Sequence, residues 1–310
     1  MRRELLALRP RKLLALVLVL LIAAGVGVYI NRDDKTVLKP EHPEYLSFSG
    51  NYVFTVPKNY KVDEQSVPGI QLVYSGTISG KTLDEAYGNN AISLQPISDL
   101  THPSSKEFKA YVNNTFLPDI KKNLSTDDVK LKFAKTAGWD SARAVVASNG
   151  KPFRIIYLKN GQHPVAVVAK EETDAVKKIE TTVVDVEQSD LKKEVEPIKQ
   201  VLRTVVQSIK EQNAQELYRG AAPELRAKNT EAQVISALQR TTTYINEDAT
   251  IGGVSYIPGG FSAVMSFSSS KNPQPKLWAL DFKKIDNQWK LTAFTLPSLP
   301  ATPTQPPRNN

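Results

Sequence analysis

Hydrophobic and polar side chains follow different patterns in successive parts of this chain. From Leu13 to Ile30 the sequence LLALVLVLLIAAGVGVYI contains no charged side chain. A helix over this stretch would be about 27 Å long at a rise of about 1.5 Å per residue, which matches the hydrocarbon thickness of a bilayer. The pattern therefore predicts a transmembrane helix at residues 13–30, with the lipid bilayer as its partner.

Charges on the two sides of this stretch predict its orientation. The basic side chains before it are Arg2, Arg3, Arg9, Arg11 and Lys12, whereas acidic and basic side chains nearly balance in residues 31–35. Because cytoplasmic flanks carry the excess of Lys and Arg, residues 1–12 are expected to form a cytoplasmic basic segment and the rest of the chain to be extracytoplasmic. The alternative is a cleaved signal peptide with its cleavage site at the small residues 23–25, but the apolar pattern continues beyond them to Ile30.

After the apolar stretch the chain becomes polar and then alternates in short segments. Residues 31–44 contain two prolines and few apolar side chains, which predicts a stalk. Amphipathic patterns predict helices at 105–117 and 173–183. Short β-rich runs predict strands at 52–56, 70–74, 91–95, 143–148, 153–158 and 165–169. This order indicates an α+β domain at 45–186, in which helices cover a mostly antiparallel sheet.

A second domain is predicted at 190–299, with its helices first and a curved antiparallel sheet after them. Its first helix is expected to begin near Pro197 or to bend there, because a proline inside a helix removes a backbone donor. The apolar positions of this helix are Leu191, Val195, Ile198, Leu202, Val205 and Ile209. Further helices are predicted at 214–218 and 230–240, and strands at 250–257, 261–268, 276–285 and 288–296. The Pro-rich tail at 300–310 is expected to be disordered.

Composition limits the classes of function. The chain has 310 residues, of which 41% are hydrophobic and 23% are charged, so it can form about two domains outside the membrane. Much of the net charge of +8 lies before the predicted span, which is typical of a topology determinant and does not indicate nucleic-acid binding. Cysteine is absent, which excludes a disulfide framework, thiolate metal sites and a cysteine nucleophile.

Two resemblances to known families accompany these patterns. SFSGNYVFTVPKNYKV, AGWDSARAVVAS and FRIIYLKNGQHPVAVVA resemble the fold of the PsbP protein of the photosystem II lumen and its bacterial relatives, over residues 45–186. This resemblance implies a fold and a non-enzymatic role, and it transfers no functional residue. VVQSIKEQNAQELYRGAAPELRA and IDNQWKLTAFTL resemble the nuclear-transport-factor-2-like cone fold, also called SnoaL-like. Some members of that family are isomerases or dehydratases and others only bind or pack, so the resemblance leaves the activity open.

Side chains that could perform chemistry are sparse. His42, His102 and His163 precede or lie in turns and have no second ligand at a helical or strand spacing. Ser189 and Lys192 match the S-x-x-K pattern of penicillin-interacting enzymes, but the other motifs of those enzymes are missing and a helix cap explains the pair. The adjacent acids Asp127-Asp128, Glu171-Glu172 and Glu247-Asp248 lack the alternating oxygens of a calcium loop. We therefore expect no catalytic residue, no cofactor and no metal site.

The remaining candidates are aromatic side chains of the predicted cone. Tyr218, Tyr244, Trp278 and Trp289 are candidate residues of a ligand pocket, and the alternative is that they belong to the core. The sequence thus favours a single-pass membrane protein of a bacterial cell envelope that binds or scaffolds an envelope protein or a small apolar ligand. The alternative is a small-molecule isomerase, lyase or hydrolase that uses the cone cavity.

Overall fold

The computed structural model describes residues 43–49, 51–67, 70–76, 86–87, 90–136, 138–211, 213–241, 248–269 and 272–295. The predicted anchor, the tail and residues 31–42 of the predicted stalk lie outside this part of the chain. No helix within the described ranges is long and apolar enough to cross a membrane. The described residues form two units, of which the first comprises 43–195 and 252–257 and the second comprises 196–251 and 258–295.

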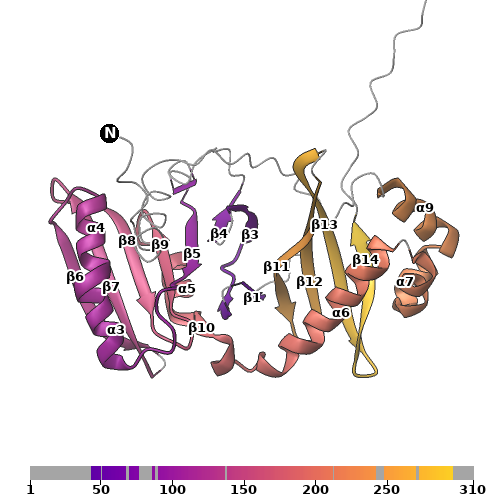
Figure 1. The fold of residues 1–310 in the computed structure, drawn as a ribbon, viewed down its shortest axis with the longest axis horizontal. Coiled ribbons are helices and arrows are strands. Elements are labelled where there is room, and N and C mark those ends of the chain that lie inside the picture. Colours follow the sequence, from indigo (N-terminus) through magenta and orange to yellow (C-terminus); the bar gives the residue numbers. More distant parts are fainter. Residues whose placement is uncertain are drawn as a thin grey trace, which may run out of the picture. The chain divides into compact units, whose positions relative to one another are not determined.

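An antiparallel sheet with the strand order β3-β4-β5-β9-β8-β7-β6 forms the centre of the first unit (Figure 1). Its strands are β3 (Tyr60–Val67), β4 (Ile70–Ser75), β5 (Ile92–Pro96), β6 (Val129–Thr136), β7 (Trp139–Ser148), β8 (Lys151–Lys159) and β9 (Val165–Ala169). Asn149 and Gly150 join β7 to β8 with φ angles of 52° and 74°, as a tight turn between antiparallel strands requires. The strands predicted at 143–148, 153–158 and 165–169 are thus present as β7, β8 and β9, which pair antiparallel in this order.

Hydrophobic side chains cover both faces of this sheet, because successive residues of a strand point to opposite sides. Leu72 of β4 and Val168 of β9 belong to one core, together with Phe108 and Val112 of the helical segment. Val73 and Val167, one position away, belong to the core on the other face. That second core also contains residues of β1 (Glu44–Ser47), β2 (Tyr52–Thr55) and helix α5 (Asp174–Thr182). The sheet is therefore the middle layer of the first unit.

The helical segment before β6 is longer than the sequence predicts. It consists of α3 (Ser105–Tyr111), the π-helical turn η1 (Val112–Phe116) and α4 (Leu117–Asn123). A capping box starts it, because Ser104 Oγ accepts from the Glu107 N–H and the Glu107 carboxylate accepts from the Ser104 N–H. The predicted helix ended at residue 117, but in the π-helical turn the Leu117 N–H donates to the Val112 carbonyl and the helix continues through Pro118.

A second antiparallel ladder in the first unit contains β10 (Val184–Asp185), β2 and β1. β1 also pairs with residues 253–256 of β11 (Asp248–Ile257), so a strand predicted for the second domain contributes to the first unit. At Gly253 a Cβ atom would lie 2.4 Å from the Leu46 carbonyl oxygen, which is closer than real Cβ atoms approach. A glycine is therefore required for this strand to lie against β1.

The second unit contains the helices α7 (Ala214–Gly220), α8 (Pro223–Lys228) and α9 (Glu231–Thr241), and most of α6 (Lys192–Lys210). Its antiparallel strands are β12 (Gly260–Ser269), β13 (Asn272–Ile285) and β14 (Gln288–Thr295). α6 is one helix that begins before Pro197 and contains it, and its buried residues include the predicted Ile198, Leu202, Val205 and Ile209. The structure is thus α+β with antiparallel sheets, and α8 is a helix that the sequence analysis missed.

Candidate ligand pocket

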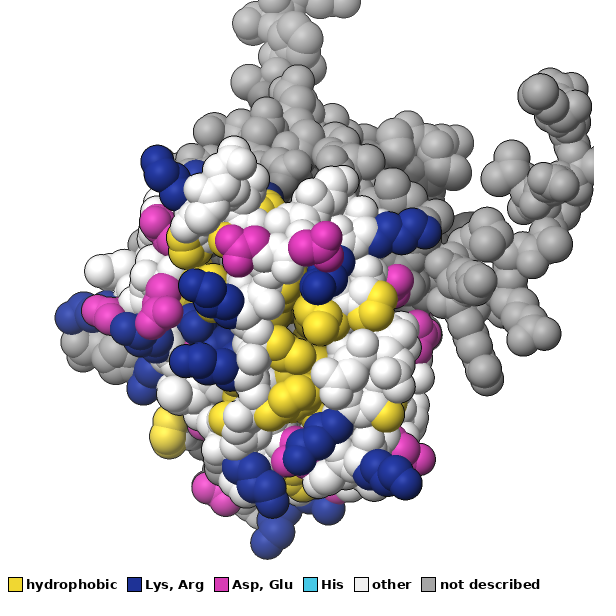
Figure 2. Space-filling view, turned by 90° about the vertical axis from the view of Figure 1, so that its left-hand side faces the viewer, with side chains coloured by type: hydrophobic (Ala, Val, Ile, Leu, Met, Phe, Trp, Pro, Cys, Tyr) yellow, Lys and Arg dark blue, Asp and Glu magenta, His cyan; other side chains and the backbone are white. Residues whose placement is uncertain are grey.

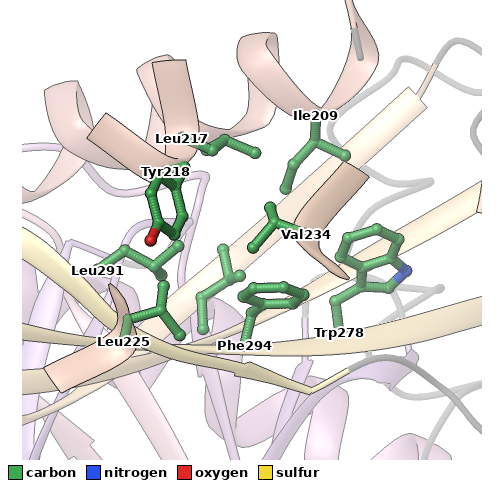
Figure 3. A pocket seen from close by; sticks show the side chains of 9 residues that line it. Ile209, Leu217, Tyr218, Leu225, Val234, Trp278, Leu291 and Phe294 are labelled. Atoms are coloured by element: carbon green, nitrogen blue, oxygen red, sulfur yellow. The ribbon is translucent and has the colours of Figure 1, made fainter. Parts of the chain in front are cut away.

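A small pocket lies between the helices and the strands of the second unit (Figure 3). The four helices α6, α7, α8 and α9 and the strands β13 and β14 each supply at least one side chain to the pocket. The residues that line it are Ile209 of α6, Leu217 and Tyr218 of α7, Leu225 of α8, Val234 of α9, Trp278 and Leu280 of β13, and Leu291 and Phe294 of β14. Trp278 and Leu280 share a face of β13 because they are two residues apart, and this face points to the helices.

The pocket is apolar and almost full. Its volume is about 10 Å³, which is the room for about one water molecule. Tyr218 Oη is the only side-chain oxygen that the described residues contribute to the lining, and it donates to the Arg226 carbonyl at 3.5 Å, near the limit of a hydrogen bond. Small-molecule sites are usually far larger and combine apolar walls with a few polar groups. This geometry is that of a packed core with a residual gap.

Of the four candidate pocket residues, the structure brings two together. Tyr218 and Trp278 both line the pocket, and Trp278 is almost completely buried. Trp289 is not among the lining residues and packs edge-on against Phe261, with ring centroids 5.0 Å apart. Tyr244 lies outside the described residues. The sequence suggested two of the three lining aromatics, but neither Phe294 nor the aliphatic residues around them, whose spacing is that of any buried helix or strand face.

The carboxyl group of Asp281 lies near the pocket in sequence but on the opposite face of β13. It follows Leu280, which lines the pocket, and it is paired across the strands with Ser262 of β12. Burial raises the pKa of Asp281, and the hydrogen bond from Ser262 Oγ at 2.7 Å partly opposes this shift. This acid therefore has a structural partner and does not face the pocket.

The S-x-x-K pair is also engaged in local contacts. The Ser189 hydroxyl donates to the Val186 carbonyl at 3.0 Å, and Lys192 Nζ forms an ion pair with Glu187. The Ser189 carbonyl accepts from the Lys192 N–H at 3.2 Å, as at the start of a helix. No acyl-transfer arrangement is formed by this pair, and the role as a helix start explains the pattern.

Two histidines that are far apart in the sequence meet in the first unit. The ring centroids of His102 and His163 are 5.8 Å apart, and His163 Nδ1 lies 3.4 Å from a carboxylate oxygen of the buried Asp185. The same carboxylate accepts from the His163 N–H at 2.8 Å and from the Glu187 N–H at 2.9 Å, which fixes the turn. Within the described residues no group of three His, Cys, Asp or Glu side chains could hold a metal ion. His42 lies outside these residues.

No family model and no curated protein matches the sequence. The structure is similar to the solution structure of cyanobacterial PsbP (CyanoP) from Synechocystis sp. PCC 6803, with 10% sequence identity and a TM-score of 0.33. The similarity covers 50% of this chain and 98% of that chain.

Proposed function

We propose that this chain is a membrane-anchored, extracytoplasmic protein of a bacterial cell envelope that binds or scaffolds other molecules without catalysing a reaction. In this proposal residues 13–30 are the anchor, the first unit is a PsbP-like domain and the second is a nuclear-transport-factor-2-like domain. The single observation that carries the proposal is the pocket of the second unit, which has a volume of about 10 Å³ and, among the described residues that line it, no ionisable side chain other than Tyr218.

An enzyme that used the cone cavity would need a catalytic acid or base in the pocket and room for a substrate. A general acid or base must reach the reacting atom of the substrate through a hydrogen bond, directly or through one water molecule. The described part of the chain contributes neither a carboxylate nor an imidazole to the pocket, and the pocket volume leaves no room for an organic substrate. Binding through outer surfaces is therefore the function that this geometry supports.

The proposal is tested with the full-length chain in nanodiscs. A thermal-shift screen of small molecules is followed by mass spectrometry of every compound that shifts the melting temperature. We expect no compound to be converted. The enzymatic alternative would replace this proposal if turnover survives purification and is lost in Val234→Phe, which fills the pocket, but not in Ile235→Phe on the exposed side of the same helix.

The location is tested separately. A reporter enzyme fused after Asn310 should be active only outside the cytoplasm, because the basic residues of segment 1–12 retain the N-terminus inside. A reporter that is active in the cytoplasm would overturn the orientation.

A further inference from the structure

Strand β6 is the last strand of the central sheet of the first unit, and no described strand pairs with its outer side. Its inner side pairs with β7 along the whole length from Val129 to Thr136 without a register shift. The strand also contains no proline. Natural proteins usually protect an edge with prolines, bulges, a very short strand or charged side chains, especially lysines, because open backbone groups pair readily with another chain, and of these devices β6 has only the lysines. β6 is therefore a long and regular open edge.

The backbone direction shows which groups are open. The Asp128 carbonyl accepts from the Ala147 N–H at 2.8 Å, so the backbone of Asp128 faces β7. In an antiparallel pair the residues alternate between the two sides, so the N–H and C=O groups of Leu131, Phe133 and Lys135 point away from β7. These groups form a row to which an added strand could bind.

The side chains of β6 are hydrophobic on one face and basic on both. Leu131 is half-buried against the core beneath the helices, and Phe133, two residues later on the same face, is 39% exposed. Lys130, Lys132 and Lys135 are exposed, and none of them forms an ion pair with a described side chain. No acidic residue interrupts the strand.

Figure 2 shows the side of the molecule on which β6 lies in Figure 1. Hydrophobic side chains form a stripe on this surface, and Lys and Arg side chains lie beside it with several acidic side chains among them. The half-buried hydrophobic residues that pack against the core beneath the helices include Val129 and Leu131 of β6. The edge thus combines open backbone groups with an apolar stripe and positive charge.

We propose that β6 binds an extended acidic segment of a partner protein by strand addition, an inference that rests on the proposed binding function. The positive charge of the β6 edge favours an acidic partner. A second copy of β6 would place lysines beside lysines, and like charges on neighbouring strands repel each other. An acidic strand instead brings carboxylates next to Lys130 and Lys132 on one face, while its backbone pairs with the open row and its apolar side chains contact Phe133 on the other face.

An anionic membrane surface would attract the same lysines, but it fits the edge less well. Lipid head groups could neutralise Lys130 and Lys132, yet they would not pair with the regular row of outward N–H and C=O groups on Leu131 and Phe133. The lysines also lie on both faces of the strand, which suits an extended chain beside the edge better than a plane.

The test measures binding of a fluorescent peptide of about ten residues with alternating Glu and Val to the full-length chain in neutral nanodiscs. Two matched peptides separate the contribution of charge from the contribution of backbone hydrogen bonds. One replaces Glu by Lys, and the other keeps every side chain but carries a methyl group on each backbone nitrogen. We expect only the unmodified acidic peptide to bind, with an affinity that falls as salt is added.

Variants locate the site. Lys130→Glu/Lys132→Glu should weaken binding by about tenfold or more, whereas Lys170→Glu/Lys178→Glu makes the same change of charge on exposed residues outside β6 and should have no effect. Phe133→Ala should weaken binding without reversing the charge preference. Circular dichroism of each variant confirms that it is folded.

Three results would overturn the inference. They are equal binding of the N-methylated peptide, no binding of the acidic peptide to the folded chain, and displacement of the peptide by phosphatidylglycerol vesicles in the wild type but not in Lys130→Glu/Lys132→Glu. Each of these leaves the non-catalytic function standing, because that function is refuted only by turnover. A chain that binds the peptide and also converts a substrate would refute the proposed function and retain the β6 site.

Discussion

Replacing Arg143 tests whether an ion pair between the central sheet and helix α5 stabilises the first unit. Arg143 Nε donates to both carboxylate oxygens of Glu180 at 3.1 and 3.3 Å, and its Nη2 donates to Glu172 at 2.9 Å. The Glu180 side chain is 11% exposed and that of Arg143 is 28% exposed. Arg143→Met keeps an unbranched apolar stem of similar reach but leaves Glu180 without its cation.

The loss of stability expected for Arg143→Met depends on how deeply Glu180 is buried. Removal of one partner of a fully buried pair costs about 3–5 kcal/mol, mostly because a charge remains buried without compensation. Water still reaches part of this pair, so we expect the free energy of unfolding to fall by about 2 kcal/mol at neutral pH. Glu180→Gln in the Arg143→Met background removes the uncompensated charge and should recover more than half of this loss.

The loss should depend on pH in a defined direction. Burial raises the pKa of Glu180 above its usual value of 4.5, and Arg143 opposes this shift. Without Arg143 the pKa of Glu180 rises further, so protonated Glu180 is stable in the folded state. The destabilisation of Arg143→Met should therefore be smallest below pH 4.5 and grow as the pH rises through the raised pKa.

The free energy of unfolding of the first unit is measured by urea unfolding, monitored through hydrogen exchange in peptides from β7 and β8. A change below about 0.5 kcal/mol at neutral pH, or a change of equal size at acidic and neutral pH, would refute the reasoning, because an exposed pair behaves in that way. The matched control is Lys178→Met on α5, which lies on the exposed side of the helix and should have little effect.

Three further predictions concern other parts of the chain. Burial, with nearby carboxylates, raises the pKa of Tyr111 to about 12, so its contribution to stability should be lost as the pH rises from 10 towards 12, and Tyr111→Phe should abolish this loss in an alkaline unfolding series. Gly253→Ala places a Cβ against the Leu46 carbonyl and should destabilise the first unit by about 2 kcal/mol, measured by urea unfolding. Leu225→Ala should enlarge the pocket, cost about 3 kcal/mol and make toluene raise the melting temperature, whereas Ile235→Ala should not.

The sequence predicts those strands well whose side chains are buried on both faces. β9 was expected at 165–169 and has these bounds, because five apolar residues between turn signals leave one interpretation. β6 was missed because lysines fill three of its eight positions and hide the alternation of Val129, Leu131 and Phe133. That alternation is the signal that could have revealed the edge strand.

The contacts around the candidate sites depend on tertiary structure that no local pattern encodes. His102 and His163 were interpreted as separate turn residues, and the fold places them beside one another next to Asp185. The aromatics of the predicted cone were recognised by their position in strands and helices, but only packing decides which of them face the pocket. Trp289 has the same alternation as Leu291, which lines the pocket, and nevertheless packs against Phe261.

The pairing of β1 with β11 is the most non-local of these contacts, and it bears on how the chain can be divided. The residues 187–190, where the predicted domains at 45–186 and 190–299 meet, are polar and few, and separate folding of the two domains is a prediction. A cut between the two predicted domains would remove residues 253–256 of β11 from their place beside β1. β1 would then pair with β2 on one side and have no strand on the other. Because an exposed strand edge binds other chains, a first unit prepared without these residues would gain an open edge in addition to β6. Peptide binding at β6 is therefore best assigned in the full-length chain, in which residues 253–256 already occupy β1.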